Sequence, residues 1–554
     1  MRILLIHPCS DGTSSEHVVH RPDLITADVE TVTQALADIR PDVVVSSVRF
    51  EAWPDAVVIG AGESATEALA RAERQWADER MSRTSRGAKG SVLLVGAGVV
   101  NLITALRLVR AGYDVVVHDR SPDPRDDAHW TAYGATRGGG DGRMFTLTEA
   151  DSYHNRARTP DGSSNELLTR PISDNGWLVA KPGDLSAAEL RWAEEFHSIP
   201  VWLADSYNED IFDVNRAAGA EWERLIESDP ALFHDGTGYR DGILRLYTDT
   251  EYFRWHVARN DRVGATRTVL APEQVGEGYP ALAQACADGT ILGGIEVVGF
   301  TVNIHKFVAR LLELLEREGV RFHWNEHATG IRWAAPGVAD GIETETGVLR
   351  GDHYVLSPGA YGDELLRGTA SHGRIQGMLG VWLTVPNVEP RLEHSVKIAR
   401  KGHLAEETNV TLATDESGAP VLVCGAGYGW TGLAPGNVDS AELDLLFDSL
   451  EDTIRRFFPE AHAAARKAGT LDASRKLCVR PWTSSCLGVF ETVATARGGT
   501  LVVTGGHNTG GFTQSPVVAE AVLAALQGEA HSMHSRYHPL RLERFTAPAA
   551  PRPA

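Results

Sequence analysis

The hydrophobic positions between residues 92 and 119 predict a strand, a helix and a second strand. "VLLV" is a continuous apolar run, residues 99–110 repeat their apolar positions at helical spacing, and "YDVVVH" is a second apolar run. The turn before the helix reads Gly-Ala-Gly, and Asn101 occupies the third glycine place of the G-x-G-x-x-G pattern. This order of elements predicts a dinucleotide-binding βαβ unit with an altered turn.

The polar and glycine positions of this unit suggest how it binds a nucleotide. Gly96 allows a tight exit from the strand, and Gly98 allows a pyrophosphate to approach the amides at the helix start. Asn101 either moves the helix away from the sheet or directs its amide at a neighbouring group. Asp119 ends the second strand, where a carboxylate binds a ribose and repels a 2′-phosphate, which favours FAD or NAD over NADP. The alternative is a glycine-rich turn in an ordinary βαβ unit.

Residues 1–85 alternate apolar runs with helical patterns and predict a separate small α/β layer. Three short apolar runs, the first being "RILLIH", predict strands, whereas residues 26–40 and 63–81 have helical spacing. The polar segment 82–90 predicts a linker without core-forming residues, so we expect nucleotide binding to survive removal of residues 1–85. A partner surface, an active-site lid and a contact between two copies of the chain each suit this layer.

The composition narrows the class of protein and of partner. A chain of 554 residues with 43% hydrophobic and 23% charged residues is globular and long enough for two or three cores. The net charge of −21 and the lack of a dense Lys/Arg run argue against nucleic acid as a partner. No apolar run approaches the roughly 20 residues of a transmembrane helix, and no signal-peptide pattern begins the sequence, so we expect a cytoplasmic protein. The cysteines lack C-x-x-C spacing and the histidines lack paired spacing, so no metal is expected.

A second glycine-rich block, "TGGHNTGGFTQSP" at residues 504–516, stands between an apolar strand and an apolar helix. The start of that helix therefore presents backbone amides to whatever lies at the strand ends. Upstream, residues 302–333 predict an amphipathic helix followed by a strand. The second block argues against an NAD-dependent dehydrogenase that relies on the first turn alone.

In their order along the chain, these blocks resemble the D-amino-acid oxidase superfamily of FAD-dependent enzymes, especially its sarcosine and glycine oxidase and D-amino-acid dehydrogenase branches. The other similar segments are "YGATRGGGDGR", "YVLSPGAYGDELL" and "CVRPWTSSCLGVF". The resemblance implies a mixed α/β fold, in which a Rossmann-like FAD-binding domain carries an inserted antiparallel-sheet substrate domain. The implied FAD-binding domain comprises residues 91–138, 296–365 and 471–545, and the implied substrate domain comprises residues 139–295 and 366–470.

The function implied by the resemblance is oxidation of the C–N bond of an amino acid or N-substituted amino acid. Hydride transfer to the flavin gives an imine that hydrolyses, and oxygen or another acceptor takes the electrons. The side chain and chirality of the substrate stay open, as does the choice between oxidase and dehydrogenase. An NAD-dependent dehydrogenase and a non-catalytic nucleotide-binding or scaffold protein are the alternatives.

The resemblance also assigns site residues. Arg480, in the Arg-Pro segment, corresponds to the residue whose guanidinium forks onto the substrate carboxylate, and Trp482 is expected to wall the site. Cys478 occupies the place of a covalent flavin attachment in the sarcosine-oxidase branch, although an inert buried thiol is the common alternative. The remaining expected cofactor contacts are Gly96, Gly98, Asn101, Asp119, Arg120, Thr136, Arg137, Ala328, Gly359, Gly505, Gly506, His507, Asn508, Thr509, Gly510 and Gly511.

Overall fold

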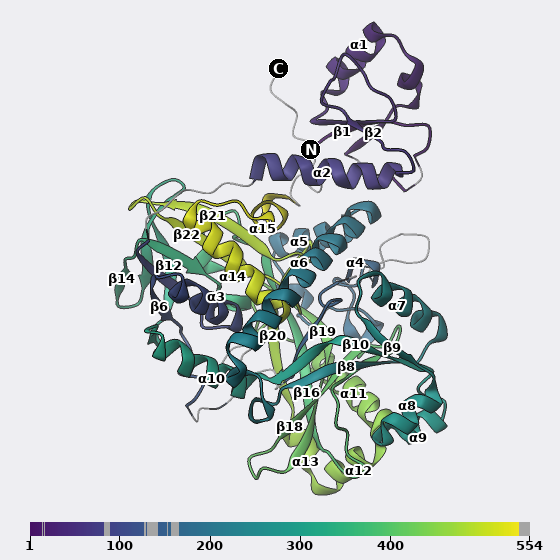
Figure 1. Ribbon diagram of the computed structural model, residues 1–554, viewed down its shortest axis with the longest axis vertical. Helices are drawn as coiled ribbons and strands as arrows, with labels where there is room; N and C mark the ends of the chain where they lie inside the picture. Colours follow the sequence, from purple (N-terminus) through teal and green to yellow (C-terminus); the bar gives the residue numbers. More distant parts are fainter. Residues whose placement is uncertain are drawn as a thin grey trace.

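The computed structural model describes residues 1–10, 12–13, 15, 17–81, 89–126, 129, 142–151, 153–156 and 166–541. The strands within these residues form one four-stranded sheet and two nine-stranded sheets. The small sheet belongs to an N-terminal unit, residues 1–81, which sits at one end of the molecule above the body, residues 89–541 (Figure 1). Among the described residues, no helix has both the length and the apolar character needed to span a membrane.

The N-terminal unit is the small α/β layer that the sequence predicts, with one additional short strand. Its four strands are parallel and lie in the order β2-β1-β3-β4. All four residues of β1 are buried, as expected for a parallel strand covered on both faces. The elements are β1 (Ile3–Ile6), β2 (Val18–His20), α1 (Val29–Ile39), β3 (Val43–Ser46), β4 (Val57–Val58) and α2 (Ala65–Met81).

Helix α2 joins the N-terminal unit to the body through buried charges. Glu73 accepts hydrogen bonds from Arg541 at 2.6 and 2.5 Å, and Arg541 also reaches Asp210 at 2.8 Å. Arg74 bonds the other oxygen of Asp210 at 2.9 Å. Burial opposes the charge of Arg541, but attraction by the two carboxylates outweighs it and raises the pKa of this guanidinium. The two parts of the chain are therefore tied by an ion-pair network, and not only by a linker.

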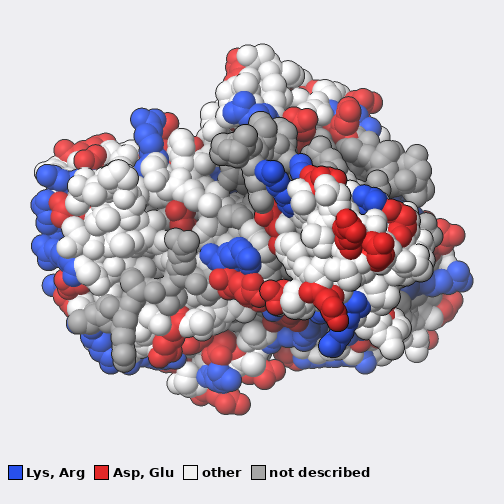
Figure 2. Space-filling view, turned by 90° about the horizontal axis from the view of Figure 1, so that it is seen from above, with Lys and Arg blue, Asp and Glu red and all other residues white. Residues whose placement is uncertain are grey.

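Charged side chains on the outer face of the molecule differ from these buried ion pairs. Acidic and basic side chains are intermixed on the face seen from above (Figure 2). Many pair locally, as Arg71 does with Glu63 at 2.8 Å. Exposed pairs of this kind contribute little to stability because water and salt screen them.

One nine-stranded sheet of the body, here called the nucleotide sheet, contains the predicted βαβ unit. Strand β5 pairs in parallel with β6 on one side and with β15 on the other, and β15 pairs in parallel with β22. Helices α3 and α14 pack on each other. The elements of this half are β5 (Ser91–Val95), α3 (Val99–Arg110), β6 (Asp114–His118), α10 (Ile304–Arg317), β11 (Arg321–His323), β12 (Ala328–Ala335), β13 (Val338–Thr344), β14 (Gly347–Leu349), β15 (His353–Leu356), β21 (Val489–Thr495), β22 (Thr500–Gly505) and α14 (Gly511–Gln527).

The other nine-stranded sheet, here called the opposing sheet, is antiparallel except where β17 pairs in parallel with β8. Helix α11 packs against β16 and β19, and α12 packs against β16. The strands are β7 (Gly142–Thr146), β8 (Arg240–Tyr247), β9 (Thr266–Leu270), β10 (Gly293–Asn303), β16 (Ile375–Pro386), β17 (Val396–Ala399), β18 (Glu407–Thr414), β19 (Pro420–Gly432) and β20 (Lys476–Thr483). The remaining helices are α4 (Tyr153–Arg156), α5 (Ala187–Ser198), α6 (Val201–Ser228), α7 (Thr250–Arg262), α8 (Pro272–Gly278), α9 (Ala283–Ala287), α11 (Ser440–Phe457), α12 (Pro459–Ala468), α13 (Thr470–Ala473) and α15 (Ser532–Arg536).

The mixed α/β fold expected from the sequence is confirmed. Strand pairing places β10 and β20 in the opposing sheet, although the sequence segmentation grouped residues 296–303 and 471–483 with the FAD-binding domain. Along the chain, each of these strands comes just before elements of the nucleotide half. A domain boundary drawn by chain position therefore assigns them to the wrong sheet. Arg480 and Cys478 thereby stand on the opposing sheet.

Candidate active site

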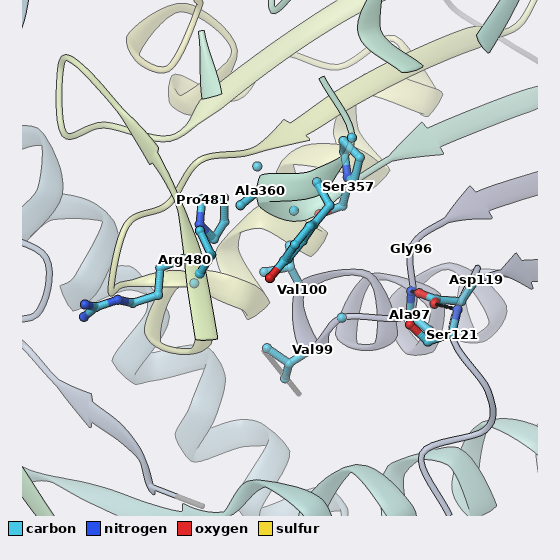
Figure 3. A pocket seen from close by; sticks show the side chains of 18 of the residues that line it. Gly96, Ala97, Val99, Val100, Asp119, Ser121, Ser357, Ala360, Arg480 and Pro481 are labelled. Carbon is cyan, nitrogen blue, oxygen red and sulfur yellow. Dashed lines mark hydrogen bonds between the residues drawn. The ribbon is translucent and has the colours of Figure 1, made fainter. Parts of the chain in front are cut away.

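A cavity of about 530 Å³ extends from the start of α3 to the opposing sheet. That size falls within the usual range of small-molecule sites. Residues of the glycine turn, of the loop after β15 and of β20 surround it (Figure 3). The cavity therefore touches both segments that the sequence predicts to bind the cofactor and the segment predicted to bind the substrate.

Glycine suits the two positions of the first turn for different structural reasons. Gly96 has a φ of 98°, and a Cβ there would collide with the carbonyl oxygen of Ser357 at the end of β15. A Cβ on Gly98 would meet no atom within 4 Å, and Gly98 lines the cavity. No side chain of the described residues caps the start of α3 after Gly98, so its first amides are available to an anion. The turn fits the pyrophosphate of a dinucleotide.

Asn101 and Asp119 hold this turn in shape. Asn101 is fully buried, and its Nδ2 donates to the carbonyls of Val95 at 2.9 Å and Gly96 at 2.8 Å. This is the second of the two outcomes expected for Asn101, with its amide directed at neighbouring groups. Asp119 lines the cavity and accepts from the backbone N–H groups of Ala97 at 2.6 Å and Ser121 at 2.7 Å (Figure 3). Further lone pairs of its carboxylate remain for a ribose hydroxyl.

The second glycine-rich block reaches the cavity through only part of its length. Gly505, His507, Asn508, Thr509 and Gly511 line it, whereas Gly506 and Gly510 are not among the described lining residues. Asn508 fixes the loop, because its Nδ2 donates to the carbonyl of Cys486 at 2.7 Å and its Oδ1 accepts from the N–H of Thr483 at 3.2 Å. Burial lowers the pKa of His507 to about 4, so the imidazole beside the cavity is neutral near pH 7.

Arg480 lines the cavity, but most of its donors are already engaged. Its Nε donates to the carbonyl of Met378 at 3.3 Å, and its Nη2 donates to the carbonyls of Leu379 and Gly427. The guanidinium also lies 5.2 Å from the ring centre of Tyr428. In Figure 3 the side chain extends away from the glycine turn. In this arrangement only Nη1 remains for a substrate carboxylate. The resemblance had implied a fork of two nitrogens.

The other expected site residues are distributed unevenly. Arg120, Ala328, Gly359 and Cys478 line the cavity. Arg120 stacks on the ring of Tyr361 at 4.7 Å. Thr136 and Arg137 lie outside the described residues.

Trp482 does not line the cavity among the described residues. Its side chain is completely buried, and its ring centre lies 4.4 Å from that of Tyr153, within an aromatic cluster behind β20. The position is that of a core residue supporting the strand, and not of a cavity wall.

Many of the cavity residues were not identified from the sequence, and three of them, Glu149, Trp382 and Asn409, lie on or beside the opposing sheet. In the strands that carry Trp382 and Asn409, successive side chains alternate between the two faces. This alternation marks one face of each strand, but it does not show which strands become neighbours. Glu149 follows β7 and bonds Lys397 at 3.2 Å. Only the pairing of β16, β19, β18 and β17 brings this group together.

One cluster resembles a metal site. Donor atoms of His118, His323 and Glu326 lie within 4.8 Å of one another beside the nucleotide end of the cavity. His118 Nδ1 contacts a Glu326 oxygen at 2.7 Å, and burial lowers the pKa of His118. The two imidazoles are stacked with 9° between their planes, so their in-plane lone pairs run side by side and do not converge. This geometry favours a hydrogen-bonded support for β6 and β11.

The comparison with protein families gives the class. Residues 91–525 match the FAD dependent oxidoreductase family (DAO), so the chain belongs to this family. FAD is the cofactor of the family, and the open glycine turn, the start of α3 and the Asp119 carboxylate at the cavity fit it. The N-terminal unit lies outside the matched residues.

Particular relatives place the chain within that family. It is 28% identical over 311 residues to a D-amino acid dehydrogenase of Methylobacterium sp. (strain 4-46), covering 53% of this chain and 66% of the relative, just under two thirds of its length. It is 24% identical over 383 residues to a D-amino acid dehydrogenase of Neisseria meningitidis serogroup A, covering 64% of this chain and 87% of the relative. Glycine oxidase from Bacillus cereus ATCC 14579 shares the fold, with a TM-score of 0.55, 15% identity, and coverage of 81% of this chain and 97% of that structure.

Proposed function

We propose that this chain oxidises the C–N bond of an amino acid or N-substituted amino acid with FAD as the electron acceptor. The observation that carries the proposal is a single cavity that joins the uncapped glycine turn to Arg480. The names of the relatives, D-amino acid dehydrogenase and glycine oxidase, support an amino-acid substrate. Bound FAD supplies an acceptor for a hydride, and the protein supplies binding and orientation.

The residues of the chain divide this work. Gly98 and the first amides of α3 would hold the pyrophosphate, and the start of α14 would place partial positive charge beside the other end of the cofactor. Arg480 would hold the substrate carboxylate through Nη1, because a cationic donor is available there next to the cavity. The neutral state of His507 keeps a second positive charge out of the site.

Absorption spectroscopy of the purified protein is the direct test. Flavin bands, and their bleaching when an amino acid is added without air, are expected; an absence of bound flavin would leave the alternatives of an NAD-dependent enzyme or a scaffold protein. Hydrogen peroxide formation in air then separates an oxidase from a dehydrogenase. Arg480→Ala should lower kcat/KM by about 100-fold because a charged hydrogen-bond donor is lost. Arg497→Ala, at an exposed turn, is the matched control.

Cys478 carries a separate proposal, namely covalent attachment of the flavin. Cys478 is buried and lines the cavity, and on β20 it stands opposite Gly380 of β16. A covalent flavin should stay with the protein on acid precipitation, and Cys478→Ser should release it. Release of all colour from the native protein would rule out the bond while leaving the oxidation proposal intact.

A further inference from the structure

The opposing sheet forms a wall of the cavity that the two glycine-rich blocks do not reach. Trp382 on β16, Asn409 on β18 and Glu149 after β7 line the cavity there, together with Arg480 on β20. The register aligns Trp382 with Gly425 and Gly425 with Asn409 across β16, β19 and β18. These side chains therefore share one face of the sheet.

Trp382 forms the floor between Arg480 and Asn409. Its indole Nε1 lies against Gly425, where a Cβ would collide with it. The far edge of the same ring lies over Gly380, whose Cβ would sit 3.2 Å from Trp382 Cη2 and 2.7 Å from Arg480 Nη2. The two glycines thus let the indole lie flat, with the guanidinium at one edge and the Asn409 strand at the other.

The separation of the two polar ends follows from β19. Arg480 Nη2 donates to the carbonyl of Gly427, and Asn409 pairs with Gly425 two residues along the same strand. Two residues of a strand span about 7 Å, and β18 lies about 4.8 Å to the side of β19, so the two positions are about 8–9 Å apart. A carboxylate at Arg480 and a second polar group near Asn409 would therefore belong to one molecule of amino-acid size.

Asn409 offers an unused hydrogen-bonding group. Its Oδ1 is buried and has no partner among the described residues, although the residue lines the cavity. Most buried polar atoms in proteins are satisfied, so an unpaired one at a ligand cavity points to a bound group. A carboxamide can both accept and donate, which matches an amide or hydroxyl.

The charges around Asn409, including Glu149 of the cavity lining, balance one another. Lys397 bonds Glu149 and Glu407, each at 3.2 Å, and Arg245 stands beside Lys397 across the β8–β17 pair. Burial opposes the charge of Lys397, but the two carboxylates outweigh it and raise the pKa of the ammonium. Two carboxylates and two cations leave no net charge for a charged ligand group to neutralise, and an unpaired buried charge is costly.

From this geometry we propose that the substrate is an amino acid whose side chain ends in an uncharged hydrogen-bonding group, a carboxamide fitting best, which binds Asn409 across the Trp382 floor. The assignment rests on the proposed function, since Arg480 must hold the carboxylate. Glutamine has the required layout, with a carboxylate at one end and a carboxamide at the other. Norleucine, of similar length, lacks the hydrogen bonds, and glutamate adds a charge.

A binding measurement tests the pocket without turnover. Glutaramate, which is glutamine without its amine, and hexanoate are titrated into the flavin-loaded protein, and Kd is read from the change in flavin absorption. Glutaramate should bind about 10-fold or more tightly than hexanoate, in line with one or two net hydrogen bonds. Asn409→Ala should reduce this ratio to below about 3-fold, whereas Asn437→Ala, an asparagine on a surface loop outside the described cavity lining, should keep it. Equal binding of the two acids by the native protein, or an unchanged ratio in Asn409→Ala, overturns the inference.

Turnover separates this inference from the proposed function. The ratio of kcat/KM for glutamine over norleucine, measured for both enantiomers, should also be about 10-fold or more and should fall in Asn409→Ala. Flavin content checks that the variant folds. A protein that oxidises amino acids without preferring glutamine refutes the Asn409 assignment alone. A protein that prefers glutaramate but bleaches with no amino acid refutes the proposed function alone.

Discussion

The N-terminal unit is a parallel α/β layer, and so is the β6-β5-β15-β22 part of the nucleotide sheet, but the helix at the glycine turn begins differently from α1 and α2. In the N-terminal unit, Asp28 caps α1 by accepting from Thr31 N at 2.8 Å, and Ser64 and Glu67 bond reciprocally at the start of α2. In the nucleotide sheet, α3 follows Gly98, and no side chain in the described part of the structure caps it. A helix start satisfied by its own side chains needs no ligand, whereas a bare one is ready for an anion. A few turn residues thus decide which layer binds a nucleotide.

The two layers also differ in what the polar side chains of their helices contact. Helix α2 directs Glu73 and Arg74 into the joint with the body, whereas α3 turns Asn101 onto its own strand. The N-terminal layer is organised for attachment and the nucleotide layer for a cavity. Substitutions in the two layers should therefore have different effects on flavin binding and on stability.

The largest expected effect is loss of the cofactor from Gly98→Val. A side chain at this position enters open space in the cavity, so the protein should fold while the pyrophosphate is excluded. Flavin content of the purified variant is the measurement. Gly60→Val, at the exposed glycine after β4 in the N-terminal unit, should keep its flavin. Normal flavin in a folded Gly98→Val protein would refute the role of this turn.

The next largest effect is on stability, from Glu73→Ala. Removing one partner of a buried ion pair leaves Arg541 with less compensation, at a cost of about 3–5 kcal/mol in the free energy of unfolding. Denaturant unfolding measures it. Glu79→Ala, which removes an exposed partner of Arg80 on the same helix, should change that free energy by less than about 1 kcal/mol. Equal effects of the two changes would show that the joint is not held by its charges.

A smaller effect depends on pH. The pKa of His507 is about 4 in the folded protein because of burial, whereas an unfolded histidine titrates near 6.5. The unfolded chain therefore binds more protons in this window, and stability falls as the pH falls from about 6.5 to 4. His507→Asn should recover about 2 kcal/mol of the stability lost between pH 7 and pH 5, measured by denaturant unfolding at both values.

The smallest effect is expected from Asn101→Ala. The change removes two hydrogen bonds to the turn but also a buried oxygen that has no partner among the described residues, so the net loss of stability should be about 1 kcal/mol. Flavin should stay bound, because Asn101 does not line the cavity among the described residues. A thermal shift and the flavin content of the variant check both statements. Loss of flavin without loss of stability would assign Asn101 a direct role in binding.

The parts of the fold that depend on local sequence could be predicted. Strand β5, the turn, α3 and β6 follow from periodicity and glycine positions within one short segment. The same holds for α1, α2 and the helix start at Gly511. The short strand β2, with three half-buried residues, has too little pattern to stand out.

The parts that depend on distant pairing could not be predicted. Trp382 and Asn409 become neighbours only through β19, and the bulges of that strand shift its register. Glu73 and Arg541 are separated by 468 positions, so nothing local to either residue marks the pair. The expectation that nucleotide binding survives removal of residues 1–85 stays a prediction, but such a removal would uncover the charges of Asp210 and Arg541.

The Glu73–Arg541 contact sets an order of events during synthesis. The N-terminal unit is synthesised before the body and has its own small core around β1, so it can form early. Its docking helix, however, keeps an unpaired carboxylate until Arg541 is made and folded beside it. The N-terminal unit is thus made before the body but fixed in place late, and its attachment reports that the segment up to Arg541, including α14 of the cofactor site, has been made.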